Sequence, residues 1–226
     1  MQNNKQISPE NILHITSGEI TANQLKKQLP QDDILPFNEA MCEGETCAEI
    51  FSDAFYRLRA AAYEVPLQEY LQKSPGNFLQ SCLKNYDTLH LYFDYDMFCA
   101  VNVITLLAFL EQAEYPGQIK FQLLEADGTV KVLDTWPVIL GNYKKCYTKV
   151  LLDRQRFVTG NELLDKGIAL YLDYKKKNNR ITRYIAAHGS AEQMQLVQEL
   201  LLKFADYGLT DMAAAKFIAA VRDKKR

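Results

Sequence analysis

The stretch ILHITSG, residues Ile12–Gly18, is a short apolar run that ends in a serine and a glycine. Such a run is typical of a buried strand that closes in a tight turn. Ala22, Leu25 and Leu29 then recur at helical spacing, and Pro30 closes that segment. A strand followed directly by a helix predicts the first half of a βαβ unit, in which the next strand runs parallel to the first.

The alternation of strand and helix continues along the first part of the chain. Apolar runs at Ile34–Phe37, Thr88–Phe93 and Ile119–Leu124 predict three more strands, and Val130–Leu133 is a candidate hairpin partner of the last. Pro36 lacks an amide proton, so the second strand is expected either at an edge of the sheet or to end early. The sequence therefore predicts an α/β fold with a mostly parallel sheet of four strands, or slightly more, flanked by helices.

Helical patterns fill the gap between the second and third strands, at Cys47–Tyr63 and in shorter pieces up to Leu83. Beyond Pro137 the pattern is helical only, with amphipathic segments at Gln193–Phe204 and elsewhere. We expect a flexible arm over residues 1–10, an α/β domain over residues 11–140 and an all-helical subdomain over residues 141–226.

The two halves of the chain carry opposite charge, although the net charge is only −2. Residues 1–140 hold 9 Lys and Arg against 19 Asp and Glu, whereas residues 141–226 hold 17 against 9. A charge split of this kind indicates either that the halves dock on each other or that the basic half binds nucleic acid. Docking is the favoured interpretation, and nucleic acid stays as the alternative partner.

The composition favours a cytoplasmic protein without a membrane segment. The stretch Met97–Leu110 is the longest apolar one, and it is too short to span a bilayer. The first residues, Met1 to Glu10, are polar and do not resemble a secretory signal. The chain has 5 cysteines, an odd number without a Cys-x-x-Cys pair, so we expect reduced thiols.

The strand ends are where function is expected, because ligands of parallel sheets bind at the carboxyl ends of the strands. The first strand ends in His14, Ser17, Gly18 and Glu19. A strand, a glycine turn and a helix can present backbone N–H groups to a phosphate. The alternative is an ordinary turn, with His14 hydrogen-bonded in the core.

Acidic residues follow the second and third strands. Glu39 and Glu43 lie after the second strand, and Asp94 and Asp96 end the third. A carboxylate pair at a strand end can hold a divalent metal ion. The alternatives are solvated acids on a surface loop and an Asp96 that caps the next helix.

The acids would crowd one edge if the three strands are neighbours. Crowded carboxylates resist ionisation and need a cation. The cation is either a metal, a cationic ligand, or a basic side chain of the chain itself, for which Arg57 and Arg59 are candidates.

Three sequence blocks resemble the bacterial domain-of-unknown-function family 1835. They are LHITSGEITANQL at Leu13–Leu25, the Leu-Pro to Glu-Gly stretch of residues 35–44, and YFDYD at Tyr92–Asp96. Glu19 stands where the family has Asp, and Tyr95 and Cys42 stand where it has His. The resemblance implies an α/β domain with a helical C-terminal region, and it implies no known activity. It points to the same strand-end residues.

These observations predict a protein that binds a small phosphorylated or metal-associated ligand at the strand ends. If it is an enzyme, a metal-assisted hydrolase or transferase is expected, with His14 moving a proton and with Asp94 and Asp96 holding the metal. The alternative is a regulatory or interaction protein whose basic C-terminal helices contact nucleic acid or a protein partner. The predicted site consists of His14, Ser17, Gly18, Glu19, Glu39, Glu43, Asp94 and Asp96.

Overall fold

The computed structural model of the chain describes residues 10–125, 130–188 and 191–223. Most of the arm predicted over residues 1–10 lies outside these residues, as do the Asp127-Gly128 turn and the basic end Lys224–Arg226.

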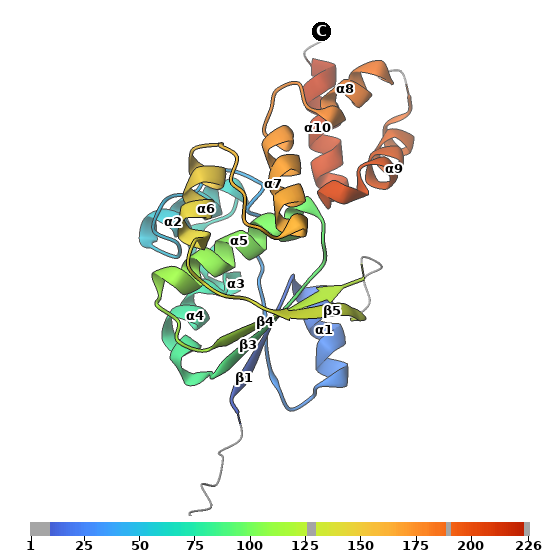
Figure 1. The fold of residues 1–226 in the computed structure, drawn as a ribbon. Coiled ribbons are helices and arrows are strands. Elements are labelled where there is room, and N and C mark those ends of the chain that lie inside the picture. The colour runs from blue at the N-terminus through green and yellow to red at the C-terminus, as the bar shows by residue number, and fades with distance from the viewer. Residues whose placement is uncertain (1–9, 126–129, 189–190, 224–226) are drawn as a thin grey trace, which may run out of the picture.

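The sheet has five strands in the order β2-β1-β3-β4-β5 (Figure 1). They are β1 (Ile12–Thr16), β2 (Asp33–Pro36), β3 (Thr88–Phe93), β4 (Gln118–Leu124) and β5 (Val132–Pro137). The first four strands in sequence are parallel, and β5 is antiparallel to β4. The predicted mostly parallel α/β sheet and its final hairpin are therefore confirmed, and the strand that contains Pro36 is an edge strand.

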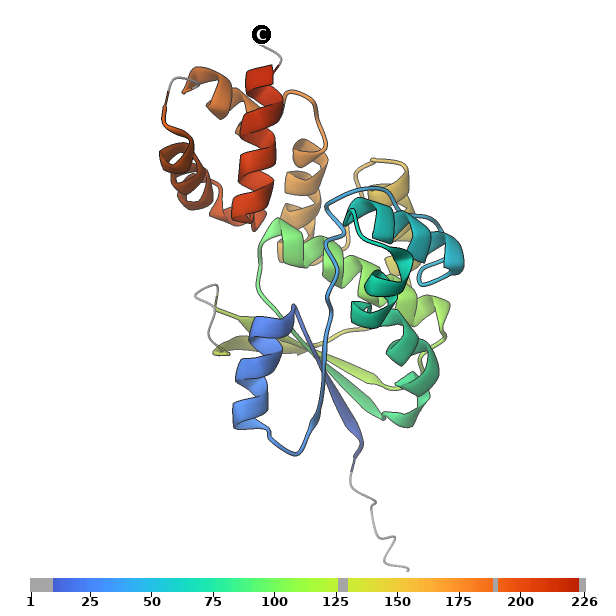
Figure 2. The ribbon, with the colours of Figure 1, turned by 180° about the vertical axis from the view of Figure 1, so that it is seen from behind.

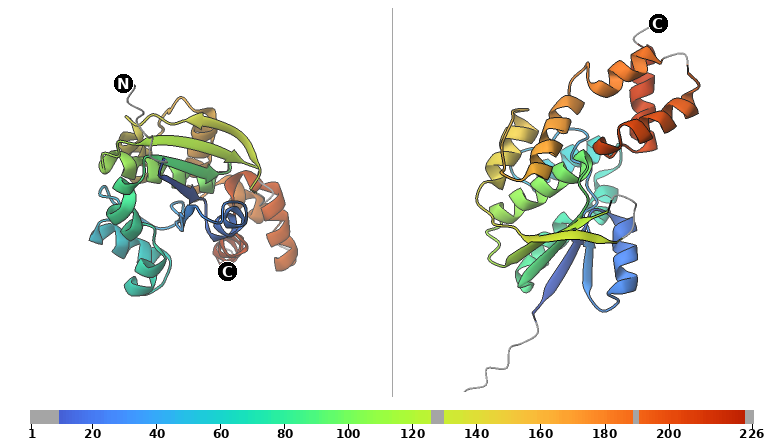
Figure 3. Two further views of the ribbon diagram at one scale, coloured as in Figure 1. Left: turned by 90° about the horizontal axis from the view of Figure 1, so that it is seen from below. Right: turned by 45° about the vertical axis from the view of Figure 1, so that its right-hand side comes forward.

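Helices cover the two faces of the sheet unequally (Figures 1 and 3). One face carries α1 (Glu19–Gln28). The other carries α2 (Asp53–Ala62), α3 (Leu67–Lys73), α4 (Gly76–Cys82), the 3-10 turn η1 (Leu83–Asn85) and α5 (Met97–Gln112). Because side chains of a strand alternate between faces, Leu13 and Ile15 of β1 enter the main core on the α5 side. His14 points to the α1 side, where it lies beside Tyr92 of β3.

Helix α5 is buried along almost its whole length, from Met97 to Leu110. It lies between the sheet and a second helical layer, so apolar residues are needed on all its sides. That layer consists of α6 (Tyr143–Tyr147), the π-helical turn η2 (Thr148–Leu152) and α7 (Glu162–Tyr174). Within the described residues, no helix is both long and apolar enough to cross a membrane.

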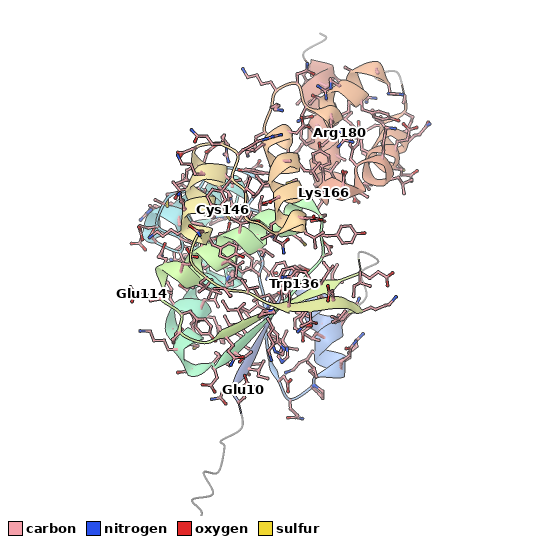
Figure 4. All side chains as sticks on the ribbon, viewed as in Figure 1. Glu10, Glu114, Trp136, Cys146, Lys166 and Arg180 are labelled. Carbon is pink, nitrogen blue, oxygen red and sulfur yellow. The ribbon has the colours of Figure 1, made fainter. Side chains whose placement is uncertain are left out.

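The last helices form a group that extends away from the sheet (Figures 1 and 2). This group, which we call the outer helices, consists of α8 (Arg180–Ala187), α9 (Gln193–Lys203), the turn η3 (Ala205–Tyr207) and α10 (Asp211–Asp223). Figure 4 places Arg180 among the outer helices and Trp136 at the sheet. The turn η3 packs on α5 and α7, which brings the start of α10 close to the strand ends.

Ion pairs join the acidic and basic halves of the chain. Within the part of the chain that the structure describes, three cross between them: Lys144 to Glu49 at 3.6 Å, Arg154 to Glu45 at 3.5 Å and Lys216 to Glu64 at 3.4 Å. Part of the positive charge of the C-terminal half therefore lies against the N-terminal half, as the docking interpretation expects.

Candidate ligand-binding site

A cavity of about 700 Å³ lies at the carboxyl ends of β1 and β2. The chain passes from β1 to β2 on one side and from β2 to β3 on the other, so the strand order reverses beside this cavity. Its walls are formed by the loops that follow β1 and β2, by α2 and α3, by the start of α5, by the end of α7 and by the segment that runs from η3 into α10. This is the position at which open α/β sheets bind ligands.

Five of the eight predicted site residues line the cavity: Ser17, Gly18, Glu19, Glu39 and Glu43. They come together because β1 and β2 are adjacent and parallel, so that both strands end at the same edge.

The loop after β1 leads directly into α1 at the wall of the cavity. Gly18 is the N-cap of α1 and supplies no side-chain cap, so the first backbone N–H groups of the helix have no intrahelical or capping partner. Glu19 accepts a hydrogen bond from Asn38 Nδ2 at 3.0 Å, which links this turn to the loop after β2. The wall therefore combines helix N–H donors with a carboxylate that is already hydrogen-bonded.

The loop after β2 is held by a buried ion pair. Arg59 Nε lies 3.3 Å from Glu39 Oε2, and neither side chain is exposed to solvent. Tyr70 donates a hydrogen bond to the other oxygen of Glu39. Burial raises the pKa of Glu39, and the nearby Arg59 and Tyr70 oppose that rise. Of the three alternatives for the cation near these acids, the structure shows the basic side chain Arg59 beside Glu39.

The same loop is fastened from two sides. The Arg59 guanidinium donates to the carbonyl oxygens of Ala40, Glu43 and Glu45. From α5, Asn102 donates to the Glu39 carbonyl oxygen at 2.6 Å and accepts from the Met41 amide at 3.0 Å. All these donors and acceptors are satisfied within the chain, so the wall is formed before any ligand arrives.

Residues at the end of α7 also form hydrogen bonds to the loop after β2. Tyr174 donates a hydrogen bond to the Glu43 carboxylate, and Lys175 Nζ donates to the Cys42 carbonyl oxygen at 3.0 Å. Residues more than a hundred positions apart in sequence therefore share this wall of the cavity.

Cys42 lines the cavity but is not a reactive thiol. Burial, with a smaller effect of Glu43, raises the pKa of the Cys42 thiol to about 12. A thiol at that pKa is protonated at neutral pH and is a poor nucleophile.

His14 lies on the face of the sheet that α1 covers, and it does not line the cavity. It is buried under α1, with Nδ1 3.1 Å from the Tyr92 hydroxyl and Nε2 3.1 Å from Asp32 Oδ2, although the latter contact lacks hydrogen-bond geometry. Burial lowers its pKa and Asp32 opposes that change. The proposed proton-transfer role of His14 in the cavity was therefore wrong, because strand alternation turns its ring toward α1.

Asp94 and Asp96 also lie outside the cavity wall. Asp94 faces a separate small cavity of about 20 Å³ beside Tyr95. Asp96 caps α5 by accepting from the Cys99 amide at 2.6 Å, as the alternative interpretation of the sequence expected. The two acids that were expected to share a site with Glu19 thus do not line the cavity, although the Asp96 carboxylate lies against Gly208, which does.

The ligand atoms of Asp94, Asp96 and Cys99 lie within 4.8 Å of one another. However, Asp94 accepts from the Asp96 amide and Asp96 accepts from the Cys99 amide, so each carboxylate already has a partner. Burial raises the pKa of the Cys99 thiol well above its usual range, which disfavours the thiolate that a metal would need. This donor set does not favour a divalent cation, and we assign no metal to it.

Asp96 should make the stability of the protein depend on pH. Burial and the neighbouring Asp94 raise the pKa of Asp96 to about 7, so ionisation opposes folding as the pH rises from about 4 to about 7. Asn keeps the cap without the charge. We expect Asp96→Asn to exceed the wild type in free energy of unfolding by about 2 kcal/mol at pH 8, and by almost nothing at pH 4.

Urea unfolding at several pH values will measure this difference. Asp53→Asn, which changes an exposed acid in the first turn of α2, is the control and should change stability by less than about 0.5 kcal/mol. A stability difference for Asp96→Asn that is the same at pH 4 and pH 8 would refute the assignment.

Several cavity residues were not predicted from the sequence. Among them are the aromatic residues Tyr63, Tyr70, Phe98, Tyr174 and Tyr207. Their patterns are those of ordinary amphipathic helices, so no local signal separates them from core residues. Asn102 does not line the cavity but holds its wall, and it was detectable in the sequence because an amide inside an apolar helix requires a buried partner.

No protein-family model, no curated protein and no solved structure matches this chain. The argument for function therefore rests on the geometry and chemistry of the site itself.

Proposed function

We propose that this protein binds a small organic molecule in the cavity at the carboxyl ends of β1 and β2. The observation that carries the proposal is the coincidence of size and place. A volume of about 700 Å³ falls in the range of ligand pockets, roughly 300 to 1,000 Å³. The cavity also lies beside the reversal of strand order, where ligands of such sheets bind.

The lining indicates a ligand with an apolar or planar body. Phenol rings of Tyr63, Tyr174 and Tyr207 and the ring of Phe98 contribute to the walls. Aromatic walls of this kind favour flat or apolar groups, while a few polar groups set the orientation. Here the polar groups are the α1 turn and the acids of the two strand-end loops.

The rigid construction of the wall supports binding. The Glu39–Arg59 pair and Asn102 hold the loop after β2 in one conformation. A wall that is already ordered loses little entropy when a ligand enters, so more of the contact energy appears as affinity.

The same geometry favours binding over catalysis. The histidine expected to move a proton faces α1, and the thiol at the cavity, Cys42, is protonated. We therefore propose a binding or sensing role for the cavity and assign no catalytic residue.

We also propose a cytoplasmic location and membership of domain-of-unknown-function family 1835. The location is supported by the 5 cysteines, all of which are free thiols. The family is supported by the position of the first two sequence blocks that resemble it. These blocks include the ends of β1 and β2, and the loops that follow both strands line the cavity.

Filling the cavity should abolish ligand binding. Leu209 lines the cavity between η3 and α10, and Leu209→Trp adds bulk there. Leu202→Trp is the matched control, because Leu202 is 83% exposed on α9. In ligand-observed NMR with a library of aromatic and aliphatic fragments, we expect fragments that bind the wild type and Leu202→Trp but not Leu209→Trp.

Thermal unfolding gives an independent measurement of the same effect. A fragment at 100 times its dissociation constant should stabilise the wild type by about 2.7 kcal/mol. If every fragment that binds the wild type binds Leu209→Trp equally well, or if no fragment binds, the proposal fails.

A further inference from the structure

A second hollow, which we call the basic groove, opens beside the cavity. It has a volume of about 840 Å³ and is lined by the loop after β2, the loop after η2, the end of α7 and one side of α10. The cavity and the basic groove share four lining residues, namely Glu43, Tyr174, Ala213 and Lys216. A molecule larger than the cavity could therefore extend into the basic groove without leaving the protein surface.

Positive charge exceeds negative charge in the basic groove. Its acids are Glu43 and Glu45. Its cations are Arg154, Arg156, Lys175, Lys176 and Lys216. A concave surface with a surplus of cations attracts anions more strongly than a flat one, because the low-dielectric walls concentrate the field.

Two of the cations are held in place by the chain. Arg154 donates to the Leu151 carbonyl oxygen at 2.6 Å and lies over the Tyr171 ring. Lys175 is fastened to the Cys42 carbonyl oxygen, and burial together with Arg154 lowers its pKa. A bound anion would relieve the repulsion between these two neighbouring cations.

Two further cations are exposed to solvent and can contact a bound anion. Arg156 makes no hydrogen bond or ion pair with any other described residue. The Lys176 ammonium group, just beyond the end of α7, has among the described residues a single ion-pair contact, at 3.6 Å to Asp173. A guanidinium and an ammonium group together provide the donors that phosphate oxygens require.

We propose that the basic groove binds the phosphate group of a ligand whose organic part occupies the cavity. This inference rests on the proposed function and adds the chemical class of the ligand, a phosphorylated small molecule. It places the phosphate on the basic groove and not at the glycine turn after β1, where the sequence had suggested it. A small ligand is favoured over nucleic acid because the cations face a hollow that continues into the cavity.

Inorganic pyrophosphate is the probe that isolates the basic groove from the cavity. Isothermal titration calorimetry at about 150 mM salt, where long-range attraction is screened, will measure its affinity. We expect Arg156→Gln combined with Lys176→Gln to weaken pyrophosphate binding about tenfold or more. The control pair, Lys177→Gln with Arg183→Gln, removes two exposed cations outside the basic groove and should bind as the wild type does.

Leu209→Trp separates the failure of this inference from failure of the proposed function. The substitution fills the cavity, and Leu209 does not line the basic groove. Pyrophosphate binding should therefore persist in this variant. Pyrophosphate binding without any fragment binding would leave the basic groove as an anion site and remove the cavity. Fragment binding without pyrophosphate binding would overturn the phosphate assignment and leave the cavity.

Two other results would also overturn the phosphate assignment. One is unchanged pyrophosphate affinity in the Arg156→Gln, Lys176→Gln variant. The other is a single-stranded oligonucleotide that displaces pyrophosphate and binds more tightly, with affinity that falls steeply as salt rises.

Discussion

Replacing Arg59 with methionine should lower the free energy of unfolding by about 4 kcal/mol, the largest effect that we expect of any single change in the site. The substitution leaves the Glu39 carboxylate buried without its counter-ion. It also removes the donors to the carbonyl oxygens of Ala40, Glu43 and Glu45. Urea unfolding at pH 8, monitored by far-ultraviolet circular dichroism, will measure the loss.

Two variants test the cause of that loss. Adding Glu39→Gln to Arg59→Met removes the orphaned charge, so the double variant should be more stable at pH 8 than Arg59→Met alone. Arg57→Met, on the exposed side of the same helix, should change stability by less than about 0.5 kcal/mol. If the double variant is less stable than Arg59→Met, the ion pair is not the cause.

The loss of stability in Arg59→Met should also become smaller at acid pH. Burial already raises the pKa of Glu39, and removal of Arg59 raises it further. Because the folded variant takes up a proton there more readily than the unfolded chain, its stability relative to the wild type should improve as the pH falls toward 4.

Replacing Asn102 with leucine should cost about 3 kcal/mol of stability. Asn102 is fully buried in α5, and its amide satisfies both the Met41 N–H and the Glu39 carbonyl group. Leucine has a similar volume but leaves both backbone groups buried without a partner. Thermal and urea unfolding of the variant will measure the loss.

Thr105→Val on the same helix is the control for Asn102→Leu. Thr105 is also fully buried, but its hydroxyl donates only to Val101 within α5. Its replacement should therefore cost clearly less, because no group of the loop after β2 loses a partner. Equal losses for the two variants would show that Asn102 does not hold that loop.

Most of the sheet could be predicted from the sequence, because the signals for it are local. The runs at Ile12–Gly18 and Thr88–Phe93 are short and apolar, and each is followed by a helical pattern. Such an alternation leaves few topologies, and the right-handed crossover rule removes most of the others. The edge position of Pro36 followed from its missing N–H group.

The candidate site could be predicted only in part. The edge of the sheet was identified correctly, and Ser17, Gly18, Glu19, Glu39 and Glu43 do line one cavity. The other three residues do not, because a residue near a strand end can face either layer of the fold or cap the next helix. No pattern in the sequence identified the cations of the basic groove as a group, since they lie on three separate segments.

The sequence by itself determined the order of strands and helices and the edge at which function is expected, because both depend on patterns within about ten to twenty residues. The tertiary structure decided which residues share a site. Glu43 meets Tyr174 across 131 positions, and Gly208 of the outer helices lies against the Asp96 carboxylate. Such contacts depend on how the outer helices pack on α5 and α7, and packing of that kind has no periodic signal in the sequence.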